Sequence, residues 1–401
     1  MRRLRCRPRG RSISGGAKHG LRGQAAIVGA ALAGLGEAPG RSSEDIAVEA
    51  SVKALAEAGL TTRHVDAVFG SLPGNANPLS ALLIAEMLGI QPKFTDNNRT
   101  GGSTFLSYTL MAAMALKEGL CETALIFYGS NQRTASGKLI SSVKPFAYEA
   151  PYAPIFPATS YALAASRHMH QYGTTREQLA AVAVAARAWA NLNPEAFMRG
   201  PLSVADVLAS RMVSSPLTVR DCCLVTDGGA ALVMTTAARA RALPKKPVYL
   251  LGAAAATTHM NIVAMPDLTQ TAAIDSGLRA FEMAGLAPRD IDVVELYDAF
   301  TINTLLFLED LGFCKKGEGG AFVASGAIAP GGALPVNTNG GGLSCVHPGM
   351  YGMFTLVEAV QQLRGEAGAR QVAGAELALC HGNGGVLSSQ VTNILGTEAT
   401  L

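Results

Sequence analysis

Two stretches of the sequence, "VKALAEAGLTTRHVDAVF" (Val52–Phe69) and "LRAFEMAGLAPRDIDVVE" (Leu278–Glu295), decide the fold because one repeats the other. Each copy predicts an amphipathic helix that ends at a glycine, then a short polar turn and a buried strand. A second pair, "ETALIFYG" (Glu122–Gly129) and "ELALCHGN" (Glu376–Asn383), follows an Ala-rich helical stretch in each case. Such a repeat predicts an α/β protein of two halves related by a pseudo-twofold axis. At the constant offset of 226 residues, seven positions of the longer pair are identical: Ala54, Ala58, Gly59, Leu60, Arg63, Asp66 and Val68.

The two halves are expected over residues 24–246 and 247–401, and the linker "ALPKKP" (Ala242–Pro247) joins them. Within the first half, residues from about 146 to 212 are rich in Pro, Tyr and Phe and carry helical pieces. This segment departs from strand–helix alternation, so we expect an inserted helical lid over the substrate. Residues 1–23 are basic and lack acidic groups, but Pro8 and Gly10 would break an amphipathic targeting helix. We therefore expect a disordered tail there.

Composition narrows the class of protein. The 401 residues are 49% hydrophobic and 16% charged, as in a densely packed globular protein. The net charge of +3 comes from the tail, because the chain without its eight basic residues has 25 basic against 30 acidic groups. No apolar run reaches 18 residues, so a membrane span is not indicated. No stripe of basic and aromatic residues indicates a nucleic-acid-binding surface. Seven cysteines without a C-x-x-C pair fit neither a disulfide framework nor a metal site, so a reducing, cytoplasmic setting is expected.

Six ordered motifs carry a resemblance to a known family. The chain from Gln24 onward resembles the thiolase superfamily, most of all the sterol carrier protein x type thiolases and their lipid-transfer-protein-like relatives. The resemblance implies a duplicated five-layered α/β/α/β/α fold, usually dimeric, that acts on acyl-CoA thioesters and joins four loops at one site. The motifs are "EGLCETALIFYGSNQR" (118–133), "SYALAASRHMHQYGTTREQLAAVAVAAR" (160–187), "RDCCLVTDGGAALVM" (220–234), "ELYDAFT" (295–301), "NTNGGGLSCVHPGMYG" (337–352) and "CHGNGG" (380–385).

The first of these loops lacks the residue that relatives use for covalent catalysis. Relatives place a nucleophilic Cys there, at the start of a helix, whereas "NRTGGSTFL" (98–106) has Gly101 or Gly102 at that position. The amides of both glycines are suited to bind a thioester or enolate oxygen. Ser103 could attack a thioester only with a base such as His347, and a Ser at a loop–helix junction is more often an N-cap. Cys121 lies beyond the helix, where an inert buried thiol is expected.

The other three loops keep groups that can move protons. Cys380 lies where relatives keep a second Cys that transfers a proton at the substrate α-carbon, although a strand-end Cys is also a common core residue. Gly382 allows a turn and a close approach to substrate. His347, with Asn339 upstream, matches a loop in which a His polarises the thioester carbonyl.

Two tyrosines depart from the family pattern. Tyr297 in "YDAF" replaces the His or Asn of relatives, and a phenol there can donate or accept a proton. Tyr351 follows His347 by four residues and could face the same cavity. Either Tyr could instead be a packing aromatic with a satisfied hydroxyl group.

These motifs predict retro-aldol cleavage of a β-hydroxyacyl-CoA without a covalent acyl-enzyme. The alternatives are a conventional acetyl-CoA C-acyltransferase and a non-catalytic acyl-CoA-binding subunit. No cofactor or metal is expected beyond the CoA thioester substrate, which Arg133, Lys138 and Arg211 could help to hold. The resemblance to steroid side-chain aldolases also implies a homodimer and a small OB-fold partner protein with a zinc ribbon.

Overall fold

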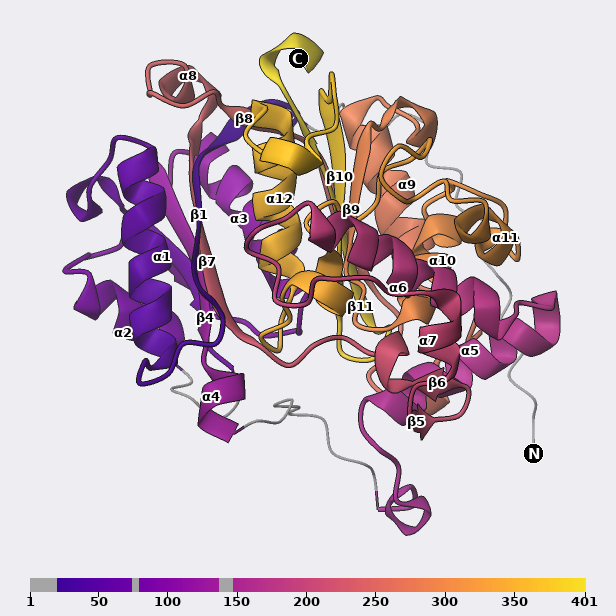
Figure 1. The fold of residues 1–401 in the computed structure, drawn as a ribbon. Coiled ribbons are helices and arrows are strands. Elements are labelled where there is room, and N and C mark those ends of the chain that lie inside the picture. Colours follow the sequence, from indigo (N-terminus) through magenta and orange to yellow (C-terminus); the bar gives the residue numbers. More distant parts are fainter. Residues whose placement is uncertain (1–19, 74–78, 137–146) are drawn as a thin grey trace, which may run out of the picture.

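The computed structural model describes residues 20–73, 79–136 and 147–401 (Figure 1). Residues 1–19 of the expected tail, Lys138, and Phe146 at the expected start of the insertion lie outside these ranges. Residues 20–23 already belong to the packed protein. The guanidinium group of Arg22 donates hydrogen bonds to the carbonyl oxygens of Ala284 (2.9 Å) and Thr400 (2.6 Å). Residues 20–23 are therefore not part of a disordered tail, contrary to expectation.

Both copies of the repeat form the same elements. The first copy contains α1 (Ser43–Glu57), the 3₁₀ turn η1 (Thr62–His64) and β2 (Ala67–Ser71); the second contains α9 (Ala273–Ala284), η5 (Pro288–Asp290) and β9 (Val293–Leu296). Each helix is followed by a glycine with a left-handed backbone, Gly59 (φ 68°) or Gly285 (φ 67°).

The repeated aspartates explain how each copy joins the next strand. Asp66 accepts hydrogen bonds from the amides of Glu122 and Thr123 at the start of β4 (Thr123–Ser130), both at 2.9 Å. The equivalent Asp292 accepts them from the amides of residues 376 and 377 at the start of β10 (Leu377–Gly384), again at 2.9 Å. The repeat thus preserves tertiary contacts as well as helix and strand periodicity.

In the described part of the chain, nine strands form one sheet in the order β3-β2-β4-β7-β1-β8-β11-β10-β9. The two halves meet where β1 pairs with β8 through Ala26↔Tyr249 and Ile27↔Val248. On either side of this junction the order is equivalent, with β4 parallel to β2 and β10 parallel to β9. The remaining strands are β1 (Ala25–Gly36), β3 (Phe94–Asp96), β7 (Asp227–Thr236), β8 (Val248–Thr257) and β11 (Ser389–Gly396).

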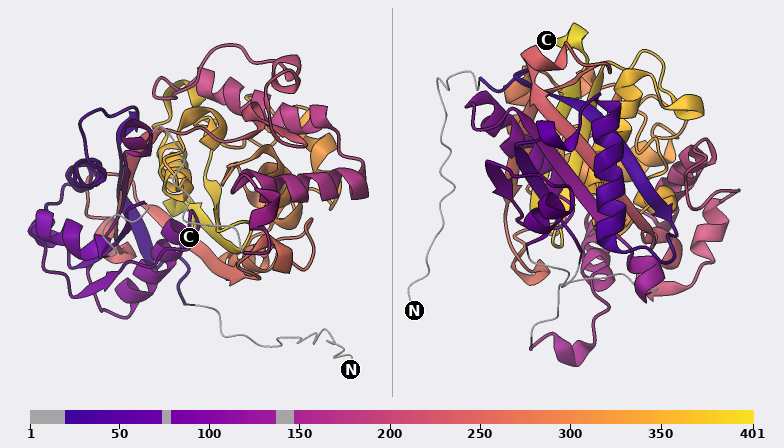
Figure 2. Two further views of the ribbon diagram at one scale, coloured as in Figure 1. Left: turned by 90° about the horizontal axis from the view of Figure 1, so that it is seen from below. Right: turned by 90° about the vertical axis from the view of Figure 1, so that its left-hand side faces the viewer.

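Two helices lie between the two halves of the sheet. Helix α3 (Thr104–Lys117) and helix α12 (Gly352–Arg364) each contact strands of both halves. Side chains on nearly every face of α12 are buried, as a helix in the centre of a layered protein requires. Helices α1 and α2 (Ser80–Met87) cover the outer face of the first half, and α9 covers that of the second (Figure 2). The five-layered α/β/α/β/α thiolase-like architecture predicted from the sequence is confirmed.

The insertion is helical, as expected, and packs on the opposite half of the molecule. It contains α5 (Ala158–Tyr172), α6 (Arg176–Asn191) and α7 (Val204–Leu208), followed by the hairpin of β5 (Met212–Ser214) and β6 (Leu217–Thr218). Helix α6 belongs to the first half in sequence but packs against α10 (Thr301–Asp310) and α11 (Gly319–Ala324) of the second half (Figure 1). Buried His168 anchors α5, because its Nε2 lies 3.1 Å from both carboxylate oxygens of Glu309.

Shorter elements complete the described chain, and none of its helices is long and apolar enough to cross a bilayer. They are α4 (Gln132–Ser136), η2 (Ala150–Tyr152), η3 (Val219–Asp221), α8 (Ala237–Ala240), η4 (Ile262–Ala264), the π-helical turn η6 (Gly341–Cys345), η7 (Gly368–Arg370) and η8 (Glu398–Thr400).

Candidate active site

Four loops meet at the N-terminal ends of α3 and α12, and glycines let their backbones touch. A β-carbon on Gly352, the first residue of α12, would lie 1.9 Å from the carbonyl oxygen of Gly102. A β-carbon on Gly384 would lie 2.0 Å from the carbonyl oxygen of Thr100. Because real β-carbons never come so close, only glycine fits at these two positions. The loop before α3 is therefore pressed directly against the "HPGMYG" and "CHGNGG" loops.

The structure brings Tyr297, His347, Tyr351 and Asn339 together. The hydroxyl oxygen of Tyr297 lies 3.1 Å from Nε2 of His347. The hydroxyl group of Tyr351 donates a hydrogen bond of 2.9 Å to Oδ1 of Asn339. The ring of Tyr351 lies nearly parallel to that of His347, with an interplanar angle of 15°. The four side chains are buried, so they form a protected cluster at the helix ends.

Burial sets the protonation state of this cluster. It raises the pKa of both phenols well above the usual value, and the Asp298 carboxylate raises that of Tyr351 further. Burial lowers the pKa of His347 to about 4. In the resting protein both phenols are therefore protonated and the imidazole is neutral. Nδ1 of His347 has no hydrogen-bond partner among the described residues, so the one hydrogen bond of this imidazole within the cluster is that between Nε2 and the Tyr297 hydroxyl group.

The ring of Tyr297 fills the space that a side chain on Gly102 would need. A β-carbon on Gly102 would lie 1.8 Å from Cε2 of Tyr297, so the phenol ring occupies the volume of any side chain at this position. Gly101 offers no alternative, because it has a φ of 100° and a β-carbon there would lie 2.9 Å from Cα of Gly384. No thiol or hydroxyl can therefore be attached at either position without moving the loops.

Ser103 does not cap helix α3, contrary to expectation. It occupies the N-cap position in a helical conformation (φ −68°, ψ −18°), which turns its side chain away from the first free amides. Its hydroxyl group instead donates to the hydroxyl oxygen of Ser389 at 3.0 Å. It is fully buried, and no hydrogen bond between described residues links it to His347. The structure gives Ser103 no base.

Cys380 is fully buried and makes its hydrogen bond to the backbone of α12. Its thiol donates to the carbonyl oxygen of Thr355 in α12 at 3.4 Å, and in the described chain it has no hydrogen bond to either tyrosine or to His347. Burial, followed by the charge of Glu295, raises its thiol pKa well above the usual value. Gly382, two residues further along β10, is the position that meets the loop of Gly102. No hydrogen bond in the described chain thus joins Cys380 to the cluster, and its catalytic role stays a prediction.

His381 and Cys121 are structural. His381 points to the opposite face of β10 from Cys380, where its ring nitrogens lie 2.9 Å from Thr392 Oγ1 and from Gln390 Oε1. Cys121 is buried before β4, and burial raises its thiol pKa to about 11. An inert thiol was expected there.

Asp298 belongs to the site but was not predicted from the sequence. Its carboxylate accepts a hydrogen bond from the amide of Gly342 at 2.6 Å and a longer one from Leu343 at 3.4 Å. A β-carbon on Gly341 would lie 2.0 Å from Asp298 Oδ2, which explains a glycine there. Burial raises the pKa of Asp298 to about 6, and the Gly342 amide opposes this rise. Asp298 thus joins the loop of Tyr297 to that of Asn339. Two features of the sequence could have indicated this contact: an acidic residue directly after Tyr297 and three glycines directly after Asn339.

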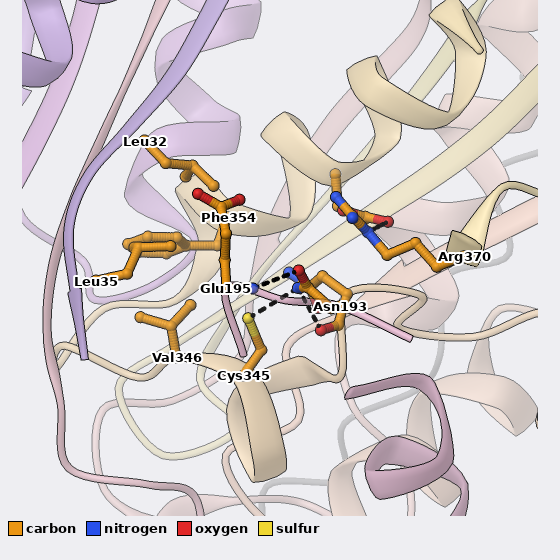
Figure 3. Close-up of a pocket in the computed structure, with 10 residues that line it drawn as sticks. Leu32, Leu35, Asn193, Glu195, Cys345, Val346, Phe354 and Arg370 are labelled. Carbon is orange, nitrogen blue, oxygen red and sulfur yellow. Dashed lines mark hydrogen bonds and ion pairs between the residues drawn. The ribbon is translucent and has the colours of Figure 1, made fainter. Parts of the chain in front are cut away.

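A small pocket adjoins the cluster (Figure 3). Asn339 and Phe354 line it and also contact Tyr351. It leaves about 10 Å³ for the centre of a water molecule, which is room for roughly one. Figure 3 shows apolar side chains on one side and Asn193 and Arg370 on the other. The full lining is Leu32, Leu35, Asn193, Glu195, Asn339, Cys345, Val346, Phe354, Glu358 and Arg370.

The groups considered for CoA and metal binding give a mixed result. Arg133 is already engaged, since its Nε donates to Glu37 at 2.7 Å and its guanidinium group lies over the Phe197 ring. Arg211 is exposed and stays a prediction. Among the described residues no three His, Cys, Asp or Glu side chains are grouped as metal ligands would be.

The duplicated layers and the four loops at paired helix ends define a thiolase-fold enzyme. The family described as "Thiolase C-terminal domain-like" matches residues 254–397. The chain is 35% identical over 386 residues to an acetyl-CoA acetyltransferase of Methanothermobacter thermautotrophicus, which covers 92% of this chain and 98% of that protein. It is 36% identical over 390 residues to a 17-hydroxy-3-oxo-4-pregnene-20-carboxyl-CoA lyase of Mycobacterium tuberculosis, with the same coverages.

A solved structure extends this similarity to three dimensions. The structure described as Ltp2-ChsH2(DUF35) aldolase superposes with a TM-score of 0.86 at 34% identity, covering 94% of this chain and 99% of that one. The chain therefore belongs to the thiolase superfamily, in the branch that holds sterol carrier protein 2 and the side-chain-cleaving aldolases.

Proposed function

We propose that this protein cleaves the Cα–Cβ bond of a β-hydroxyacyl-CoA by a retro-aldol reaction, without a covalent acyl-enzyme. The observation that carries the proposal is the Tyr297 ring in the space that a side chain on Gly102 would need, with its hydroxyl group against His347. A neutral acid–base pair thus stands where relatives form a thioester. The lyase and aldolase among the similar proteins support this direction.

The reaction begins with a proton relay. Tyr297 accepts the proton of the substrate β-hydroxyl group while it passes its own proton to the neutral Nε2 of His347. The electron pair of that O–H bond forms the carbonyl group of the departing aldehyde or ketone. The electrons of the Cα–Cβ bond move into the thioester as an enolate. An imidazolium and an enolate then arise together in the buried site, so their attraction offsets the cost of separating charge there.

The enolate needs hydrogen-bond donors and then a proton. The amides of Gly101 and Gly102 at the start of α3 supply donors, and in the described chain no acceptor for either amide is found. Tyr351 turns its hydroxyl hydrogen from Asn339 to the enolate and protonates Cα, which releases a shortened acyl-CoA. The proton held by His347 returns to Tyr351 after product release, so the cycle consumes none. This assignment leaves no step for Cys380.

We further propose the surroundings of this reaction. The substrate is bound as its CoA thioester without another cofactor, and the insertion covers it as a lid. The chain acts in the cytoplasm as a homodimer with a small OB-fold partner that carries a zinc ribbon. A partner protein is supported by the two-component description of the aldolase structure.

Incubation with a synthetic β-hydroxyacyl-CoA tests the proposal, with and without a candidate OB-fold partner. Formation of a free aldehyde or ketone together with the shortened acyl-CoA is the expected result. The acyltransferase alternative is favoured by the similarity to an acetyl-CoA acetyltransferase. It requires the intact protein to gain the mass of an acyl group after treatment with acetyl-CoA, and that gain would overturn the lyase. Binding of acyl-CoA without either reaction would support a non-catalytic subunit.

A further inference from the structure

One tyrosine of the insertion touches two of the four loops. Tyr161 lies in the first turn of α5 and is 2% exposed. Its ring stacks on Phe300, with centroids 4.3 Å apart and planes at 24°. Phe300 is the last residue of the "YDAF" segment and directly precedes α10. The ring of Tyr161 therefore packs against the loop that carries Tyr297.

The hydroxyl group of Tyr161 binds a different loop. It accepts a hydrogen bond from Nδ2 of Asn383 at 2.8 Å and donates one to the carbonyl oxygen of Gly385 at 3.3 Å. Both residues belong to the "CHGNGG" segment, with Asn383 near the end of β10 and Gly385 directly after it. A side chain of the insertion thus holds together the "YDAF" and "CHGNGG" loops of the site.

Asn383 is fixed in the orientation that this contact needs. Its Oδ1 accepts from Nε2 of Gln390 at 2.8 Å, and Oε1 of Gln390 lies 2.9 Å from Nε2 of His381. Burial lowers the pKa of His381 to about 4, so the imidazole is neutral and donates from Nε2. The chain of buried hydrogen bonds leaves Nδ2 of Asn383 directed at Tyr161.

The position of the "CHGNGG" loop controls that of the amides before α3. A β-carbon on Gly101 would lie 2.9 Å from Cα of Gly384 and from the amide nitrogen of Gly385. Because no side chain lies between the "CHGNGG" loop and Gly101, a shift of that loop must be transmitted to Gly101 and Gly102.

We propose that Tyr161 is a positioning residue that sets the distance between the Gly101–Gly102 amides and the Tyr297 phenol. The inference rests on the proposed retro-aldol function, in which those amides bind the enolate while Tyr297 takes the hydroxyl proton. The insertion then contributes to the geometry of the reaction as well as to substrate cover. The hydroxyl group of Tyr161 holds the "CHGNGG" loop, which contacts the Gly101–Gly102 amides, and its ring holds the loop that carries Tyr297.

The test compares Tyr161→Phe with the wild type in two measurements. The Phe variant keeps the stacked ring and loses both hydrogen bonds. We expect kcat for the β-hydroxyacyl-CoA to fall between about tenfold and about a hundredfold, because small misplacements of reacting groups are costly. KM should stay within about a factor of two, since the binding surface is kept. Amide hydrogen exchange of residues 380–388 should become faster, and this readout does not depend on turnover.

Tyr172→Phe is the matched control. It makes the same change near the other end of α5, where the hydroxyl group accepts from exposed Gln171, and it should leave both readouts at wild-type values. Asn383→Ala removes the same hydrogen bond from the other side, and kcat of the double variant should equal that of the worse single variant. Asn383→Ala also carries the test if Tyr161→Phe does not fold.

Two results would overturn the assignment: an unchanged kcat in Tyr161→Phe, or a reduced kcat with unchanged exchange of residues 380–388. A wild-type protein that cleaves no β-hydroxyacyl-CoA would refute the proposed function alone. The exchange measurement would then still decide whether Tyr161 holds the loop.

Discussion

Gly102 makes room for the ring of Tyr297: a β-carbon on Gly102 would lie 1.8 Å from Cε2 of that ring. The two departures from the family pattern are therefore one change in the packing of the site. The phenol ring can occupy this position because residue 102 has no side chain, and no side chain can be added there while the ring stays.

This relation predicts a strong coupling between the two positions. Gly102 has no positive φ, so an alanine suits its backbone and only the ring opposes it. Gly102→Ala should lower the free energy of unfolding by about 1–3 kcal/mol. In a Tyr297→Ala background the same change should cost close to nothing. Chemical denaturation of the four proteins measures the coupling.

Gly101→Ala provides the control for that cycle. Gly101 has a φ of 100°, and its β-carbon would meet the backbone of Gly384 and Gly385. It should therefore destabilise the protein equally with either residue at position 297. Equal effects of Gly102→Ala in both backgrounds would show that the Tyr297 ring does not limit the site.

Removal of the Tyr297 hydroxyl group should abolish cleavage. Tyr297→Phe keeps the ring against Gly102 but breaks the path from substrate to His347, so we expect a loss of about 10²–10⁴-fold in kcat. Because the ring packing is kept, thermal stability should change little. A Tyr297→Phe protein that turns over a β-hydroxyacyl-CoA at the wild-type rate would remove Tyr297 from the mechanism.

The architecture could be predicted because its signals are local and repeated. The helix, glycine and strand of each copy fold as the pattern indicates, and Asp66 and Asp292 make equivalent contacts. The membership of Tyr297, His347, Tyr351 and Asn339 in one cluster followed from motif loops that meet at helix ends.

The remaining details depend on packing between distant segments. The direction of the Ser103 side chain depends on Ser389 of β11, and neither residue type signals that contact. The alternation of side chains along a strand predicts that Cys380 and His381 lie on opposite faces of β10. It does not predict which hydrogen bond the Cys380 thiol makes. Asp298 acts on backbone amides of the glycine loop, and such contacts leave no side-chain partner in the sequence to find.

The structure predicts that Cys380 is dispensable for cleavage. Its thiol contacts the Thr355 carbonyl in the core rather than the cluster. Cys380→Ala should therefore keep kcat within about a factor of three while lowering the free energy of unfolding by about 1–2 kcal/mol through lost packing. Steady-state kinetics and denaturation on one preparation measure both. A drop of kcat comparable with that of Tyr297→Phe would return the thiol to the mechanism.

The buried histidines predict a loss of stability in mild acid. Burial lowers the pKa of His347 and of His381 to about 4 from the usual value of about 6.5. Between about pH 4 and pH 6.5 these histidines are protonated in the unfolded chain but neutral in the folded chain. Stability that is present above about pH 6.5 is therefore lost as the pH falls toward 4. From pH 7 to pH 5 each histidine should account for roughly 1–2 kcal/mol of this loss. Urea unfolding of wild type and His381→Gln across this range tests the prediction, because the variant should have a shallower pH slope. An equal slope in both proteins would mean that His381 does not stay neutral in the folded state.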